Sequence, residues 1–90
     1  MQTDERVKEL VKICYKALSE KKASDITVID ISDLSVVADY FIIASADNIR
    51  QTEALCDNVE EALYKAGFEC RQIEGKTSAN WILMDYNDVI

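Results

Sequence analysis

The sequence predicts a single α/β (α+β) domain in which a mixed β-sheet of four to five strands packs with two long helices. Its 90 residues are enough for one modest hydrophobic core. Two long stretches repeat apolar residues at helical spacing, and four short stretches are rich in β-branched or aromatic residues. Along the chain these stretches give the order α-β-β-α-β-β, which is typical of helices packed on a sheet.

The first helix is expected over residues 4–21. Thr3 is its predicted N-cap, and Lys21 and Lys22 lie at the C-terminal end, where the helix dipole favours cations. The apolar positions recur at helical spacing: Val7, Leu10, Val11, Cys14 and Leu18. This pattern predicts one buried stripe along the helix.

Two strands are expected next, over 26–31 and 40–45. The first is short and β-branched. The second, YFIIAS, is almost entirely apolar, which favours a central strand with both faces covered. Residues 33–38 between them are ambiguous, and we expect a turn followed by a short helical piece.

The second helix is expected over residues 48–66, because both of its ends carry capping signals. Asn48 can cap the N-terminus with Gln51 as its capping-box partner. Gly67 can take the positive φ of a C′ residue, and Phe68 can then pack back on the last turn.

The last third of the chain predicts a strand over 68–73, a polar loop over 74–80 and a strand over 81–86, with a fifth strand beginning at Val89. The strand–helix–strand portion that ends at residue 73 is a candidate right-handed crossover.

Charge and hydropathy limit the kinds of partner that the chain is expected to bind. The net charge is −7, from 17 acidic and 10 basic residues, which disfavours direct nucleic-acid binding and suits a basic protein partner. No apolar run is long enough to cross a bilayer, and the N-terminus does not resemble a signal peptide, so we expect no membrane contact. Cys14, Cys56 and Cys70 show no paired spacing, which indicates three reduced, mostly buried thiols and a cytoplasmic location.

The residue types argue against catalysis. The chain has no histidine, only two glycines, and no pair of carboxylates two residues apart. It therefore lacks the commonest general base, a phosphate-binding glycine loop and the usual two-metal pattern. We expect no enzyme activity, no cofactor and no metal.

The N-terminus of the second helix is the one candidate anion site. Ser45, Arg50 and Gln51 lie near it, and the unpaired N–H groups of a helix start attract anions. The alternative is that Gln51 completes a capping box and Arg50 is simply solvated.

The segment WILMDYNDVI at residues 81–90 has apolar residues on both faces of an extended strand. Ile82, Met84 and Tyr86 would share one face, and Trp81, Leu83 and Asp85 the other. One interpretation is that the second face is a partner-binding patch with an aromatic anchor. The alternatives are that Trp81 packs in the core and that Asp85 and Asp88 belong to a turn.

Three stretches together resemble the ribosomal silencing factor family, also called Iojap-like. They are ADYFII (38–43) leading to Arg50-Gln51, KKASDITVID (21–30), and Glu74-Gly75 followed by WILMDYNDV (81–89). The match covers nearly all of the chain, in order.

The resemblance implies a fold similar to a nucleotidyltransferase domain, without transferase activity. Family members bind the large-subunit ribosomal protein uL14 and block joining of the subunits, which lowers translation when nutrients are scarce. They also tend to form homodimers. The positions that match the family's recognition stretch are Trp81, Leu83, Asp85, Tyr86 and Asp88.

Two departures from the family pattern stand out. Ala46 stands where relatives usually have glycine, which weakens any relic of nucleotide binding. Relatives also continue past the position of Ile90, so we expect residues 1–90 to form one domain of this family without its C-terminal tail.

Two other functions compete with translational repression. One is a nucleotide-binding relative of nucleotidyltransferases, with its site near residues 45–50. The other is a homodimeric scaffold whose strand 81–86 pairs with itself.

Overall fold

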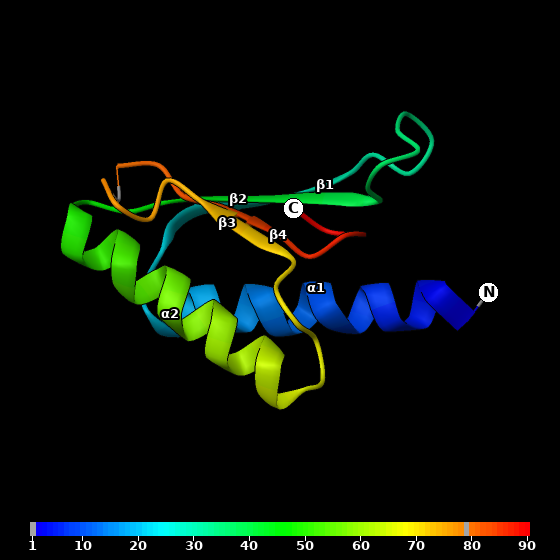
Figure 1. The fold of residues 1–90 in the computed structure, drawn as a ribbon, viewed down its shortest axis with the longest axis horizontal. Coiled ribbons are helices and arrows are strands. Elements are labelled where there is room, and N and C mark those ends of the chain that lie inside the picture. Colours follow the sequence, from blue (N-terminus) through cyan, green and yellow to red (C-terminus); the bar gives the residue numbers. More distant parts are fainter. Residues whose placement is uncertain (1, 79) are drawn as a thin grey trace.

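The computed structural model describes residues 2–78 and 80–90. Its elements follow one another as α1 (Gln2–Glu20), β1 (Ser24–Asp30), β2 (Tyr40–Ser45), α2 (Ile49–Lys65), β3 (Gln72–Glu74) and β4 (Leu83–Asp85). The predicted α+β class and the order α-β-β-α-β-β are confirmed. Figure 1 shows both helices on one side of the strands.

The strands form two antiparallel ladders among the described residues. In the β1–β2 ladder Ile29 lies opposite Phe41 and Thr27 opposite Ile43. In the β3–β4 ladder Ile73 lies opposite Met84. The four strands are therefore divided between two ladders where the sequence predicted one mixed sheet.

The end of the chain adds the parallel component of the fold. Val89 forms a parallel bridge with Tyr40. The Ile90 N–H donates to the Tyr40 carbonyl at 3.0 Å, and the Ile90 carbonyl accepts from the Ile42 N–H at 2.8 Å. Strand-like pairing thus begins at Val89, as expected. Because β3 pairs with β4 and not with β2, the expected crossover from 40–45 to 68–73 is wrong.

The core lies between the helices and the strands. Its buried members are Val7, Leu10, Cys14, Ala17, Leu18, Leu55, Val59, Leu63, Tyr86 and Val89. Along β2, Tyr40, Ile42 and Ala44 pack against this core, whereas Phe41 and Ile43 are exposed on the other face. The expectation that both faces of β2 are covered is therefore wrong for the described chain.

Both ends of α2 are capped as predicted. The Asn48 Oδ1 accepts from the Gln51 N–H at 2.8 Å, and the Gln51 Oε1 accepts from the Asp47 N–H at 2.7 Å. At the other end Gly67 has φ +94°, and the Phe68 N–H donates to the Leu63 carbonyl at 2.8 Å. This bond and the one from the Gly67 N–H to the last turn make a Schellman motif.

Three local expectations differ from the structure. Helix α1 already includes Gln2, so Thr3 is not its N-cap. Residues 33–38 form turns and bends without a helical piece. The strand expected over 68–73 is shorter and later, at Gln72–Glu74, because the Phe68 N–H still completes the C-terminal cap of α2.

The three cysteines are free, with Cys14 and Cys56 buried and Cys70 half-buried, as expected. Burial raises the pKa of the Cys14 thiol to about 12. The thiol is therefore protonated near neutral pH and acts as a small apolar core group.

Candidate protein-interaction site

Strand β4 and its flanks carry the residues that the sequence selected as a partner surface. In the antiparallel register Leu83 lies opposite Glu74, and Asp85 lies opposite Gln72. Met84, between them, packs against the core. Because strand side chains alternate, Leu83 and Asp85 share the face of the ladder that points away from the core. Both side chains are half-buried.

Trp81 precedes β4 in a bend, and its side chain is 64% exposed. The alternative of Trp81 as a core residue is therefore not what the structure shows. Its backbone, in contrast, is tightly enclosed. Gly75 has φ +83°, and a Cβ built on it would overlap the Trp81 carbonyl oxygen. A constrained backbone that carries an exposed indole is suited to present an anchor to a partner.

Asp85 and Asp88 take part in the turn that follows β4. The Asp85 Oδ1 accepts from the Asn87 N–H at 2.7 Å, and Asn87 adopts φ +76°. The Asp88 carbonyl accepts from the Asp39 N–H at 2.7 Å, which fastens the turn to the start of β2. In both residues carboxylate oxygens stay available, since these bonds use one oxygen of Asp85 and only the backbone of Asp88.

Tyr86 lies on the opposite side from Trp81. It is 8% exposed and belongs to the core cluster. Its buried hydroxyl has no hydrogen-bond partner among the described residues. Burial and the nearby Cys70 thiol raise the pKa of the phenol. The structure thus separates Tyr86 from the other four residues of the stretch, and its contribution there is to hold the turn in place.

At the candidate anion site at the start of α2, the Gln51 side chain makes hydrogen bonds within the protein. The Gln51 Nε2 donates to the Lys22 carbonyl at 3.0 Å and to the Lys21 carbonyl at 3.4 Å, while its Oε1 caps the helix. Ser45 and Arg50 are exposed. Gln51 therefore joins the end of α1 to the start of α2, and its polar atoms are used internally.

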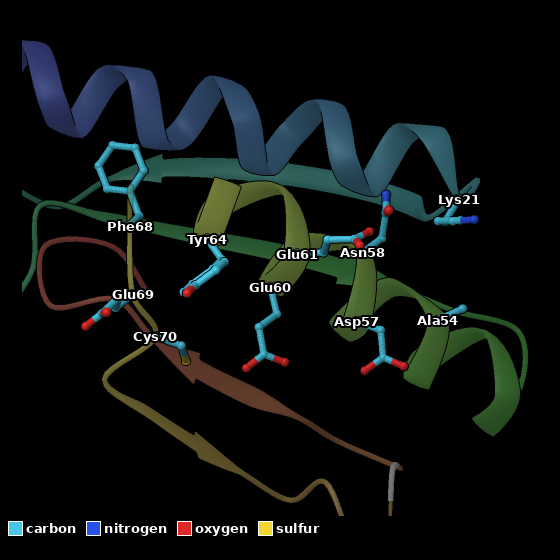
Figure 2. Close-up of a pocket in the computed structure, with 10 residues that line it drawn as sticks. All are labelled: Lys21, Ala54, Asp57, Asn58, Glu60, Glu61, Tyr64, Phe68, Glu69 and Cys70. Atoms are coloured by element: carbon cyan, nitrogen blue, oxygen red, sulfur yellow. The ribbon is translucent and has the colours of Figure 1, made fainter. Parts of the chain in front are cut away.

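The sequence did not point to a shallow depression along α2, shown in Figure 2. It is lined by Lys21, Ala54, Asp57, Asn58, Glu60, Glu61, Tyr64, Phe68, Glu69 and Cys70. The Lys76 Nζ lies 3.6 Å from the Asp57 carboxylate and 3.8 Å from the Glu60 carboxylate. These exposed ion pairs contribute little stability, but they draw the loop between β3 and β4 toward α2.

Two other kinds of feature, a metal-ligand cluster and a membrane-spanning helix, are absent from the described residues. Across 2–78 and 80–90, no three metal-ligating side chains come together at one point. Neither of the two helices is long and apolar enough to span a bilayer. The exposed indole of Trp81 is the surface feature that the partner-site hypothesis predicted.

Comparison with known proteins identifies relatives along the same stretch. Residues 4–90 match the family described as "Ribosomal silencing factor during starvation". The chain is 32% identical over 83 residues to the ribosomal silencing factor of Bacillus subtilis, covering 92% of this chain and 70% of that protein. It is 36% identical over 81 residues to that of Haemophilus influenzae, covering 90% and 79%.

Solved structures give the same fold. A crystal structure of a Chromobacterium violaceum protein superimposes with a TM-score of 0.89 at 35% identity, covering 91% of this chain and 68% of that one. A Bacillus halodurans structure gives a TM-score of 0.85 at 27% identity, covering 91% and 76%.

Proposed function

The chain belongs to the ribosomal silencing factor family, and we propose that it binds the large-subunit ribosomal protein uL14 and thereby blocks joining of the ribosomal subunits. Membership supports a ribosome-associated role in silencing translation. The observation that carries the finer proposal is the 64% exposed Trp81 side chain, which directly precedes the strand that holds Leu83 and Asp85.

The proposed mechanism needs no chemical step. Trp81 enters an apolar pocket of the partner, and Asp85 and Asp88 pair with lysine or arginine side chains around it. The bound domain of 10.2 kDa would then lie on the surface where the small subunit docks, and it would exclude the small subunit sterically. We propose no catalytic activity, and we propose that residues 1–90 act as one domain, since α1, α2, Tyr86 and Val89 share one core cluster.

Replacing Trp81 with alanine tests the anchor. Because the indole is mostly in solvent, Trp81→Ala should leave the domain folded and weaken binding by about 2–4 kcal/mol, roughly 30- to 1,000-fold. Co-sedimentation with purified large subunits measures this loss, and circular dichroism checks the fold. Tyr64→Ala is the matched control, because Tyr64 is a 69% exposed aromatic on α2.

The blocked step has its own assay. Light scattering follows the association of large and small subunits, and the wild-type chain should inhibit it whereas Trp81→Ala should not. Undiminished co-sedimentation of Trp81→Ala would remove this residue from the contact. Binding without inhibition of subunit joining would overturn the blocking mechanism alone.

Self-association is the competing use of this surface. Among the described residues β4 pairs only with β3, so its other edge makes no ladder hydrogen bonds and is a candidate for pairing with a second copy. A homodimer formed there would cover the Trp81 side of the ladder. Sedimentation equilibrium at several concentrations distinguishes the two, because a dimer that competes with the ribosome should dissociate on adding large subunits.

A further inference from the structure

The outer face of the β1–β2 hairpin is an apolar surface that the Trp81 site does not include. Cross-strand neighbours Ile29 and Phe41 lie on it beside Ile43, and all three are exposed. The helices cover only the opposite face of β2. Adjacent apolar side chains left in water on a small domain usually mark an interaction surface.

The loop between β1 and β2 extends this surface. Leu34 is 85% and Val37 71% exposed, and Val36 between them is fully exposed. In Figure 1 the loop rises from the strands on the side away from the helices. The loop therefore adds three exposed apolar side chains next to the hairpin strands.

The loop backbone is ordered by its own hydrogen bonds. The Leu34 and Ser35 N–H groups donate to the Ile31 carbonyl at 2.9 and 3.0 Å. The Ser35 Oγ accepts from the Val37 N–H at 3.0 Å. The apolar side chains are thus presented on a preformed turn, which lowers the entropy cost of docking.

The charge of the hairpin selects the partner. Residues 24–45 contain four aspartates, Asp25, Asp30, Asp33 and Asp39, and none of the chain's ten lysines and arginines. Hydrogen bonds from Ser32 lower the pKa of Asp30, which keeps it ionised. The hairpin as a whole is therefore unfavourable for phosphate backbones and anionic lipid surfaces. A second copy would oppose aspartates with aspartates, whereas a cationic protein surface is complementary.

We propose that the outer face of the β1–β2 hairpin, with the loop Leu34–Val37, is a second docking surface that binds a cationic protein segment carrying apolar side chains. In Figure 1 the β1–β2 loop and the loop that precedes β4 lie at opposite ends of the strands. The inference rests on the proposed function in one respect, because the experiments below use the large ribosomal subunit as the binding partner.

Photo-crosslinking tests the surface directly. Benzoylphenylalanine is placed at position 36, 81 or 64 in otherwise unchanged chains, and each is irradiated with purified large subunits. Position 36 should give an adduct with a basic ribosomal protein, whereas position 64, on α2, should give none. Val36 is fully exposed, so the substitution leaves the fold intact.

A binding measurement supplies the second arm. The triple variant Leu34→Ser, Val36→Ser, Val37→Ser should weaken co-sedimentation with large subunits by about tenfold or more, because apolar contacts are lost. Tyr64→Ser, an equally exposed apolar-to-polar change, should have no effect.

The outcomes separate this surface from the Trp81 site. An adduct at 36 with a basic protein, together with the loss of binding, supports the second surface. No adduct at 36, an adduct with ribosomal RNA, or an adduct between two copies of the chain overturns it. If position 81 crosslinks while 36 does not, the proposed function stands and only the second surface fails. If neither crosslinks, both fail.

Discussion

Tyr86 is a buried side chain whose hydroxyl lacks a partner among the described residues. A buried unpaired hydroxyl costs about 1–3 kcal/mol, so Tyr86→Phe should keep the ring packing and raise the free energy of unfolding by roughly 1 kcal/mol. Urea denaturation measures the change. Tyr86→Ala, which removes the ring, should lower it by about 3–5 kcal/mol.

Binding measurements on the same variants test whether the partner contacts Tyr86. Because the ring lies in the core, Tyr86→Phe should bind large subunits as wild type does. A stability loss, or weaker binding at unchanged stability, would show that the hydroxyl makes a contact in solution or in the complex.

Gly75 lies against the backbone of Trp81, and Gly75 itself has a positive φ. Gly67 and Gly75 both have positive φ, but a Cβ at Gly67 meets nothing within 4 Å, whereas one at Gly75 overlaps the Trp81 carbonyl. Gly67→Ala should therefore cost about 1–2 kcal/mol from backbone strain alone. Gly75→Ala should cost more and also weaken subunit binding, since Trp81 must move.

Two measurements separate these effects. Urea denaturation gives the free energy of unfolding of each variant, and fluorescence of Trp81, the only tryptophan, reports its environment. Equal losses in the two variants, with unchanged fluorescence at Gly75→Ala, would mean that the loop yields without displacing Trp81.

At the scale of elements, Gln51 is the polar link between the helices. Its amide caps α2 and donates to the carbonyls of Lys21 and Lys22. Gln51→Ala should lower the free energy of unfolding by about 1–3 kcal/mol, because the hydrogen bonds that its side chain makes to the N-terminus of α2 and to the end of α1 are lost together. Thermal or urea unfolding measures it.

Arg50→Ala is the matched control at the same helix start. Arg50 is exposed and makes no ion pair or side-chain hydrogen bond within the described chain, so its removal should change stability by less than about 0.5 kcal/mol. The reverse pattern, with Arg50 important and Gln51 dispensable, would contradict the assignment of Gln51 as the link between the helices.

The elements that the sequence predicted well are those whose signals are local. The span of α2 follows from helical spacing and from caps at Asn48 and Gly67, all within one segment. Strand pairing depends on residues far apart in the chain, such as Tyr40 and Val89, and no local pattern encodes it. This is why one sheet was expected where two ladders form.

The candidate site was predictable to a similar degree. Alternation placed Trp81 and Leu83 on one face and Met84 and Tyr86 on the other, and the structure puts the latter two in or against the core. Family resemblance grouped Tyr86 with the surface residues, which the burial of its ring does not support. The exposure of Trp81 was left open because both faces of the segment are apolar.

At the scale of the whole molecule, the uneven distribution of charge determines where a basic partner is attracted, more than the net charge of −7 does. All cations lie outside residues 24–45, on the helices, at their ends and near β3 at Arg71 and Lys76. The hairpin, whose loop rises away from the helices in Figure 1, therefore carries negative charge without any cation. A basic partner would be attracted to the hairpin and would meet its apolar side chains at close range.

The salt dependence of the binding affinity should separate the contribution of the charges from that of the apolar contacts. Exposed charges are screened beyond about 10 Å at 0.1 M ionic strength, so affinity for the proposed partner uL14 should fall roughly tenfold between about 0.05 M and 0.5 M sodium chloride. Apolar burial by Trp81 is not screened, so measurable binding should remain at the higher salt. Asp85→Asn should show a shallower salt dependence than wild type, and Glu61→Asn, on the exposed side of α2, should not. Titration calorimetry at several salt concentrations measures all three chains. An affinity that is constant across this range would assign the binding to the apolar anchor alone and leave the acidic surfaces without a part in it.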